Sequence, residues 1–102
     1  MYRLAVSIRA NADLDAILTY ITTNLHAPKA ASDFADAVAK CYDTIQQNPH
    51  IYEFVRDEHL KNQGYRRAVI KNYVMVYRVL EEREEVEIHR FFYGRMDYFG
   101  LI

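Results

Sequence analysis

The chain has 102 residues, a formal net charge of −1 and a sequence pI of about 6.4. This length predicts a single domain over residues 1–102. Proteins that bind phosphate backbones are usually basic, so we expect no binding to free DNA. One cysteine excludes an internal disulfide, and no apolar run predicts a signal peptide or a membrane span. These features indicate a soluble, cytoplasmic protein that does not associate with membranes.

The first half of the chain predicts a strand followed by two helices. Residues 2–8 alternate between apolar and polar side chains, which is typical of a strand that includes Ile8. Residues 10–25 place apolar side chains at helical spacing up to Leu25, and Ser7 is a suitable N-cap. Pro28 suits the first turn of a second helix, which should end before Pro49. Two amphipathic helices with a short connection predict an antiparallel hairpin.

The second half predicts three strands after an irregular segment at residues 50–64. Residues 65–71 should form a strand that leads into a tight turn at Lys71 and Asn72. Residues 73–80 are apolar on both faces, which predicts a central strand. Residues 86–92 alternate again, so Phe92 should face the core and Phe91 the other side. The predicted fold class is α+β, with an N-terminal strand, a two-helix hairpin and then a three-stranded antiparallel sheet.

Several kinds of catalytic or metal site find no support in the sequence. The four histidines are scattered and no glycine-rich loop is present, so we expect neither a metal nor another cofactor. Cys41 lies on the apolar stripe of the second helix, which favours a buried thiol over a nucleophile. Asp13 and Asp15 are two residues apart on a helix and do not face each other, so we interpret them as surface charges.

The remaining candidates for a functional site are cationic and aromatic. Arginine binds phosphate, carboxylate and base edges, and it also forms structural ion pairs within a fold. Both interpretations stay open for each arginine at this point. The combination of arginine and tyrosine near one end of the sheet favours a functional surface. The candidate contact residues are Arg66, Arg67, Lys71, Arg90, Tyr93, Arg95 and Tyr98.

The order and spacing of these segments resemble the RelE/ParE superfamily of bacterial type II toxins. The segment VSIRANADLDAILTYI, residues 6–21, resembles the opening strand and first helix of ParE-like members. The segment YRRAVIKNYVMVYRV, residues 65–79, resembles their arginine-led strand, turn and following strand. The segment VEIHRFFYGRMDY, residues 86–98, resembles the last strand and its ending, with Tyr93 in place of the usual histidine.

The resemblance implies a toxin that a cognate antitoxin neutralises, and it implies two alternative targets. ParE-like members inhibit DNA gyrase by binding, whereas RelE-like members cleave messenger RNA on the ribosome. The nuclease branch carries an arginine just before the segment that matches Met75, and this chain has Val74 there. Arginine is also a poor general base because it stays protonated. We therefore favour the ParE-like branch, with no catalysis of its own.

Two alternatives remain open. In a ribosome-dependent nuclease, the candidate catalytic residues would be Arg66, Arg67, Arg95 and Tyr98. A degenerate member would only bind its antitoxin. In every case we expect a groove beside the helix hairpin to accept an amphipathic segment of the antitoxin, whose acidic residues would reach the arginines.

Overall fold

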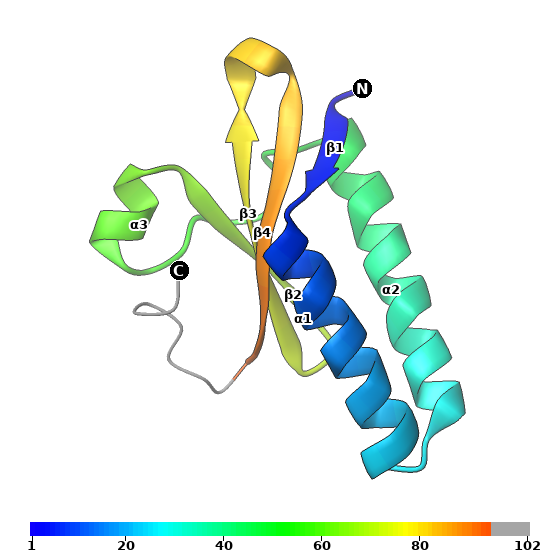
Figure 1. The fold of residues 1–102 in the computed structure, drawn as a ribbon. Coiled ribbons are helices and arrows are strands. Elements are labelled where there is room, and N and C mark those ends of the chain that lie inside the picture. Colours follow the sequence, from blue (N-terminus) through cyan, green and yellow to red (C-terminus); the bar gives the residue numbers. More distant parts are fainter. Residues whose placement is uncertain (95–102) are drawn as a thin grey trace.

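The computed structural model describes residues 1–94, which form an α+β fold with a hairpin of two long helices on one face of a sheet (Figure 1). The chain begins with β1 (Arg3–Val6), α1 (Ile8–Thr19), the π-helical turn η1 (Tyr20–Asn24) and α2 (Pro28–Gln47). It continues with α3 (Glu58–Asn62), β2 (Tyr65–Ile70), β3 (Tyr73–Leu80), the 3₁₀ turn η2 (Glu81–Arg83) and β4 (Glu85–Tyr93). No helix in this part of the chain has the length and apolarity needed to span a bilayer.

The helix hairpin forms where the periodicity predicts it. The Ser7 hydroxyl accepts a hydrogen bond from the backbone N–H of Ala10 at 3.0 Å, so Ser7 is the N-cap of α1 as predicted. Pro28 occupies the first turn of α2, which also agrees with the sequence. Two predictions at the margins are wrong, because Ile8 begins α1 instead of ending β1, and both Ile8 and Leu25 are exposed to solvent.

The sheet has the order β1-β4-β3-β2. The three later strands are antiparallel, as predicted, and β3 is an interior strand. The N-terminal strand β1 lies at one edge of the sheet and pairs in parallel with the first half of β4 (Figure 1). The main core lies between the helix hairpin and this sheet, with Phe34, Ile45, Met75 and Tyr77 among its most buried side chains.

A β-bulge at His89 changes which side chains of β4 face the helices. Val76 lies opposite Arg90 and Tyr77 lies opposite Ile88, so His89 is an extra residue without a partner on β3. The extra residue reverses the alternation beyond it. Phe91 therefore joins Ile88 in the main core, and the prediction that Phe91 faces away from it is wrong. Phe92 is also buried, but in the cluster on the opposite face of the sheet.

The face of the sheet opposite the hairpin has a second, smaller apolar cluster. Its buried residues are Val55, Leu60, Tyr65, Val74, Val76 and Phe92. Leu60 belongs to α3, a five-residue helix that the sequence analysis left within an irregular segment. The loop before α3 lies along the edge strand β2, where Val55 donates to the carbonyl of Tyr65 and Arg67 donates to that of Glu53, both at 3.0 Å. This loop covers the first half of the exposed edge of β2.

Candidate functional site

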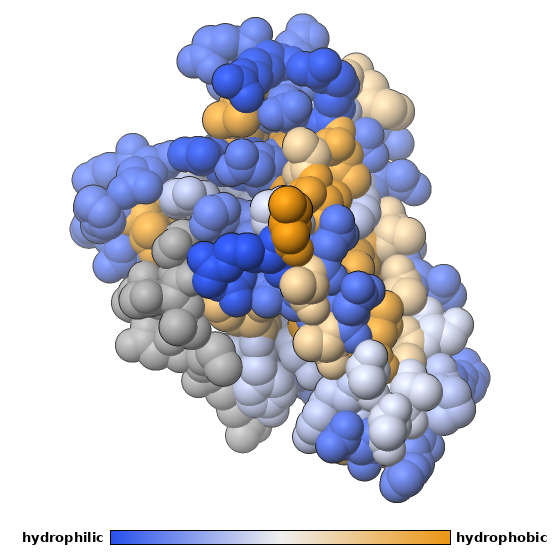
Figure 2. Space-filling model, in the orientation of Figure 1, coloured by the Kyte–Doolittle hydropathy of each residue, from blue (hydrophilic) through white to orange (hydrophobic). Residues whose placement is uncertain are grey.

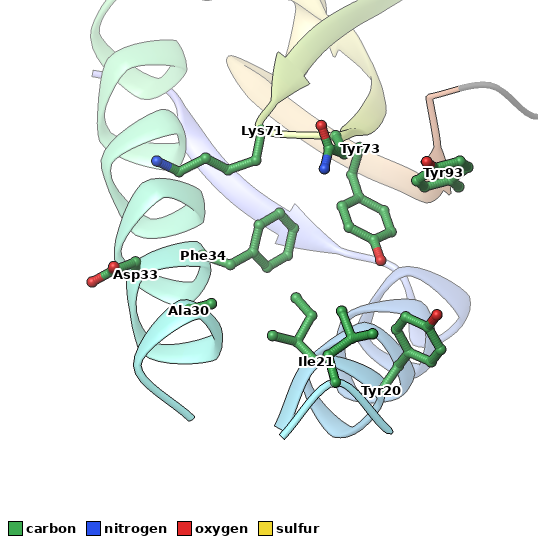
Figure 3. Close-up of a pocket in the computed structure, with 10 residues that line it drawn as sticks. Tyr20, Ile21, Ala30, Asp33, Phe34, Lys71, Tyr73 and Tyr93 are labelled. Carbon is green, nitrogen blue, oxygen red and sulfur yellow. The ribbon is translucent and has the colours of Figure 1, made fainter. Parts of the chain in front are cut away.

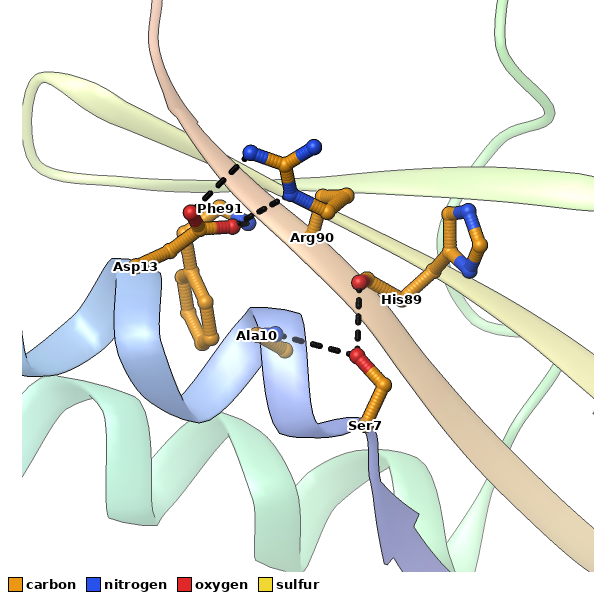
Figure 4. A network of polar contacts seen from close by, with 6 residues as sticks. All are labelled: Ser7, Ala10, Asp13, His89, Arg90 and Phe91. Carbon is orange, nitrogen blue, oxygen red and sulfur yellow. Dashed lines mark hydrogen bonds and ion pairs between the residues drawn. The ribbon is translucent and has the colours of Figure 1, made fainter. Parts of the chain in front are cut away.

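Arg90 is held by a carboxylate of α1 (Figure 4). Its Nε donates to Asp13 Oδ2 at 2.6 Å and its Nη2 donates to Asp13 Oδ1 at 3.0 Å. The backbone N–H of Phe91 donates to the same carboxylate at 3.1 Å. The hydrogen bond with Asp13 raises the pKa of Arg90, and both side chains are mostly buried. The interpretation of Asp13 as a surface charge is therefore wrong.

The Asp13 carboxylate completes a backbone edge that β1 leaves open. The paired segment of β1 ends at Val6, so the edge of β4 beyond Ile88 has no neighbouring strand among the described residues. The Ser7 N–H donates to the carbonyl of Ile88 and the Ser7 hydroxyl donates to that of His89 (Figure 4). Polar groups at the start of α1 thus make the hydrogen bonds that a neighbouring strand would otherwise make. Buried backbone N–H and C=O groups require such partners.

Arg66 and Arg67 are both bound by the loop before α3. Arg66 Nη1 donates to the carbonyl of Tyr52 at 2.7 Å, and its guanidinium lies 4.0 Å from the centroid of the Phe54 ring. Arg67 Nη1 donates to Glu53 Oε1 at 3.1 Å. Successive strand residues point to opposite faces, so the two guanidinium groups do not converge on one ligand. These contacts give each arginine a structural role.

The bulge residue His89 is a candidate that the sequence analysis missed. Its ring centroid lies 5.0 Å from that of Tyr65, and the Arg78 guanidinium lies 5.0 Å from the same ring. Arg78 pairs with Glu87 on the adjacent strand at 3.1 Å. Burial lowers the pKa of His89; the field of Glu87 opposes this shift, and the fields of Arg78, Arg90 and Arg9 add to it. Only knowledge of the bulge could have singled out this histidine.

The lowered pKa of His89 predicts a pH dependence of stability. The unfolded chain binds a proton at this position below pH about 6.5, whereas the folded chain resists it, so stability is lost as the pH falls through that range. The free energy of unfolding should fall less between pH about 7.5 and about 5.5 in H89Q than in the unmodified chain. Urea unfolding at both pH values measures the two slopes, and equal slopes would contradict this assignment.

Lys71 and Tyr93 line one groove at the end of the helix hairpin where η1 connects to α2 (Figure 3). The groove has a volume of about 820 Å³ and lies between the helices and the turn that joins β2 to β3. Tyr73 packs between two other rings, with centroid distances of 5.2 Å to Phe34 and 5.6 Å to Tyr93. The remaining lining residues are Tyr20, Ile21, Leu25, Ala30, Asp33 and Asn72. We call this site the hairpin groove.

The predicted contact residues do not form one cluster. Lys71 and Tyr93 share the hairpin groove, Arg66 and Arg67 lie along the loop before α3, and Arg90 is bound to α1. Arg95 and Tyr98 lie outside the described residues. Cys41 is buried as predicted, and burial raises the pKa of its thiol. Within residues 1–94, no group of three or more histidine, cysteine or acidic side chains is placed to hold a metal ion.

Comparison with known families identifies the class of protein. The sequence profile of the family described as the ParE toxin of the type II toxin–antitoxin system parDE matches residues 4–98. The chain therefore belongs to the ParE toxin family, within the RelE/ParE superfamily. It is a toxin of a type II toxin–antitoxin system. A comparison with curated protein sequences found no match.

Solved structures share the fold. A chain of the chromosomal ParDE system from P. aeruginosa aligns with a TM-score of 0.71 and 23% identity, covering 91% of this chain and 96% of that one. The RelBE2 toxin–antitoxin complex from Mycobacterium tuberculosis gives 0.64 and 20%, with coverages of 90% and 96%. The isolated RelE toxin from E. coli gives 0.62 and 14%, with coverages of 95% and 88%. At these identities the similarity shows the fold alone.

Proposed function

We propose that this toxin inhibits DNA gyrase by binding, without catalysis of its own, and that its site of action is the cytoplasm. The observation that carries the proposal is that three arginines of the sheet already form ion pairs within the fold. Arg67, Arg78 and Arg90 each pair with a carboxylate of the fold, on Glu53, Glu87 and Asp13 respectively. Paired guanidinium groups have less capacity to stabilise the charge of a phosphate in a transition state.

The side chain of Val74 adds a second argument against RNA cleavage. The resemblance to the nuclease branch places a functional arginine at this position, but Val74 is only 2% exposed and belongs to the smaller apolar cluster. This position therefore supplies no positive charge to a substrate. Cleavage by attack of a 2′-hydroxyl needs a general base, a general acid and a stabiliser of the phosphate, and the described arginines supply at most the last.

The hairpin groove is the site that we propose for the cognate antitoxin. Tyr20, Leu25 and Tyr93 expose about half of their surface beside it, and aromatic side chains dominate the energetics of many protein interfaces. An amphipathic helix could place its apolar face there and an acidic side chain near Lys71. The RelBE2 structure is a toxin–antitoxin complex, which supports an antitoxin as the partner of this chain.

Inducible expression in bacterial cells tests the proposal. A plasmid in the same cells should lose negative supercoiling soon after induction, before incorporation of labelled amino acids falls. Co-expression of the cognate antitoxin should restore both growth and supercoiling. Early arrest of translation with unchanged supercoiling would contradict the proposal. Unimpaired growth at high expression would also contradict it and would favour a member that only binds its antitoxin.

A ribosome-dependent nuclease is the second candidate, and His89 is the observation that favours it. Among residues 1–94 its buried Nε2 has no hydrogen-bond partner, and its lowered pKa leaves the neutral imidazole that a general base requires.

The H89Q variant separates these two candidate functions. A nuclease that uses His89 as its base should lose about 100-fold or more in cleavage of ribosome-bound messenger RNA. A gyrase inhibitor should keep its growth inhibition, because inhibition by binding requires no general base. Primer extension on a reporter message, together with growth curves, measures both effects. If the unmodified chain inhibits growth but does not cleave the reporter message, the nuclease function is excluded.

A further inference from the structure

A second groove lies between α3, the loop before it and the edge strand β2. Its volume is about 580 Å³, and we call it the basic groove. The residues that matter here are Ile51, Glu53, Phe54, Arg56, Lys61 and Arg66. The visible surface over α3 is mainly hydrophilic, in contrast to the apolar surface near the start of α1 (Figure 2).

The basic groove has three cations that form no ion pair with a carboxylate of residues 1–94. Within residues 1–94, neither Arg56 nor Lys61 has a carboxylate within ion-pair distance, and both are exposed. Arg66 adds a third cation, held by a backbone carbonyl instead of an acid. The one carboxylate of the lining, on Glu53, is already paired with Arg67. This distribution contrasts with Arg78 and Arg90, whose charges are matched within the sheet and α1.

Two exposed apolar side chains lie among these cations. Ile51 is 51% exposed and Phe54 is 39% exposed, although both are large hydrophobic side chains. Arg66 covers the Phe54 ring at 4.0 Å, and its bond to the Tyr52 carbonyl fixes the guanidinium. The ring and the cation are therefore ordered before any ligand arrives. An aromatic anchor beside an ordered arginine, with further charges at the rim, is the usual composition of a protein-binding hot spot.

We propose that the basic groove binds an acidic segment of a partner protein. One apolar side chain of that segment would lie on Ile51 and Phe54, and its carboxylates would pair with Arg56 and Lys61. Charge complementarity selects an acidic occupant. Single-stranded nucleic acid fits less well, because Arg66 already covers the Phe54 ring and the whole chain has a net charge of −1. Binding of an acidic segment at this groove does not require gyrase to be the target of the toxin.

Fluorescence anisotropy with the purified full-length chain tests this assignment. The probes are a short labelled peptide that alternates acidic residues with leucine, a peptide with lysines in place of the acids, and a single-stranded RNA. The acidic peptide should bind saturably, and the double variant Arg56→Glu/Lys61→Glu should weaken it about tenfold, or about 1.4 kcal/mol. Both positions are exposed, so circular dichroism should be unchanged.

The matched control is Arg9→Glu/Lys40→Glu, which changes the net charge equally at two exposed helix positions that form no ion pair within residues 1–94. It should bind the acidic peptide almost as well as the unmodified chain. Equal weakening by both double variants would overturn the proposal, because it would show a diffuse charge effect. Preference for the RNA over the acidic peptide would also overturn it and assign the groove to nucleic acid. Neither result depends on gyrase inhibition, so the two proposals fail separately.

Discussion

Replacing Asp13 with asparagine should lower the free energy of unfolding by about 3 kcal/mol. The carboxylate accepts hydrogen bonds from Arg90 Nε, Arg90 Nη2 and the Phe91 N–H. The side chains of Asp13 and Arg90 are only 18% and 14% exposed, so water compensates poorly for the lost charge. Breaking a buried pair by removing one partner is costly for this reason. Urea denaturation measures the change.

The neighbouring residue Asp15 provides the control for this prediction. It lies on the same helix but is exposed, and no ion pair in the described part of the chain includes it. D15N should change the free energy of unfolding by less than about 0.5 kcal/mol. If D13N is as stable as D15N, the carboxylate of Asp13 does not support the edge of β4.

Replacing Phe91 with alanine should cost about 4 kcal/mol of stability, because its side chain is 3% exposed in the main core. Strict alternation along β4 would instead place Phe91 outside that core. The size of the loss therefore tests the bulge at His89 as well as the packing. Chemical denaturation at neutral pH measures it.

Tyr93 is the matched control on the same strand. It is 43% exposed and contacts Tyr73 at the hairpin groove, so Y93A should cost less than about 1.5 kcal/mol. A loss below about 1 kcal/mol in F91A would show that Phe91 is not a core residue and that the register of β4 is wrong.

Local patterns were sufficient to predict most of the elements. The helix hairpin follows from apolar periodicity, and Ser7 and Pro28 mark the starts of its helices because their chemistry suits those positions. The interior position of β3 follows from its apolar side chains on both faces. These features depend on residues close together in the sequence, which is why a single sequence was sufficient to predict them.

Features that depend on distant residues could not be predicted from the same patterns. The ion pair between Asp13 and Arg90 joins α1 to β4, and a carboxylate on a helix gives no local sign of such a partner. The bulge at His89 depends on the register between β3 and β4. The short helix α3 is stabilised by the hydrogen bond that the Leu60 N–H donates to the Asp57 carboxylate, and by burial of the Leu60 side chain, more than by its own helix propensity.

The candidate site shows the same division. The sequence identified Lys71 and Tyr93, which share the hairpin groove, but it did not identify the groove itself. It singled out Arg66 and Arg67 by residue type, and the structure adds that Tyr52, Glu53 and Phe54 bind them. The basic groove was missed because Arg56 and Lys61 stand in a segment without a regular pattern. Arg95 and Tyr98 remain predictions from the sequence.

Supercoiling of relaxed plasmid by purified gyrase, with and without this toxin, tests the central claim most directly. Cleaved DNA is scored on the same gel, and the cognate antitoxin is added in a parallel series. The proposed function predicts that supercoiling is inhibited or linear DNA accumulates, and that the antitoxin reverses the effect. Unchanged supercoiling at a large excess of a toxin that still arrests growth would contradict it and would direct attention to the ribosome.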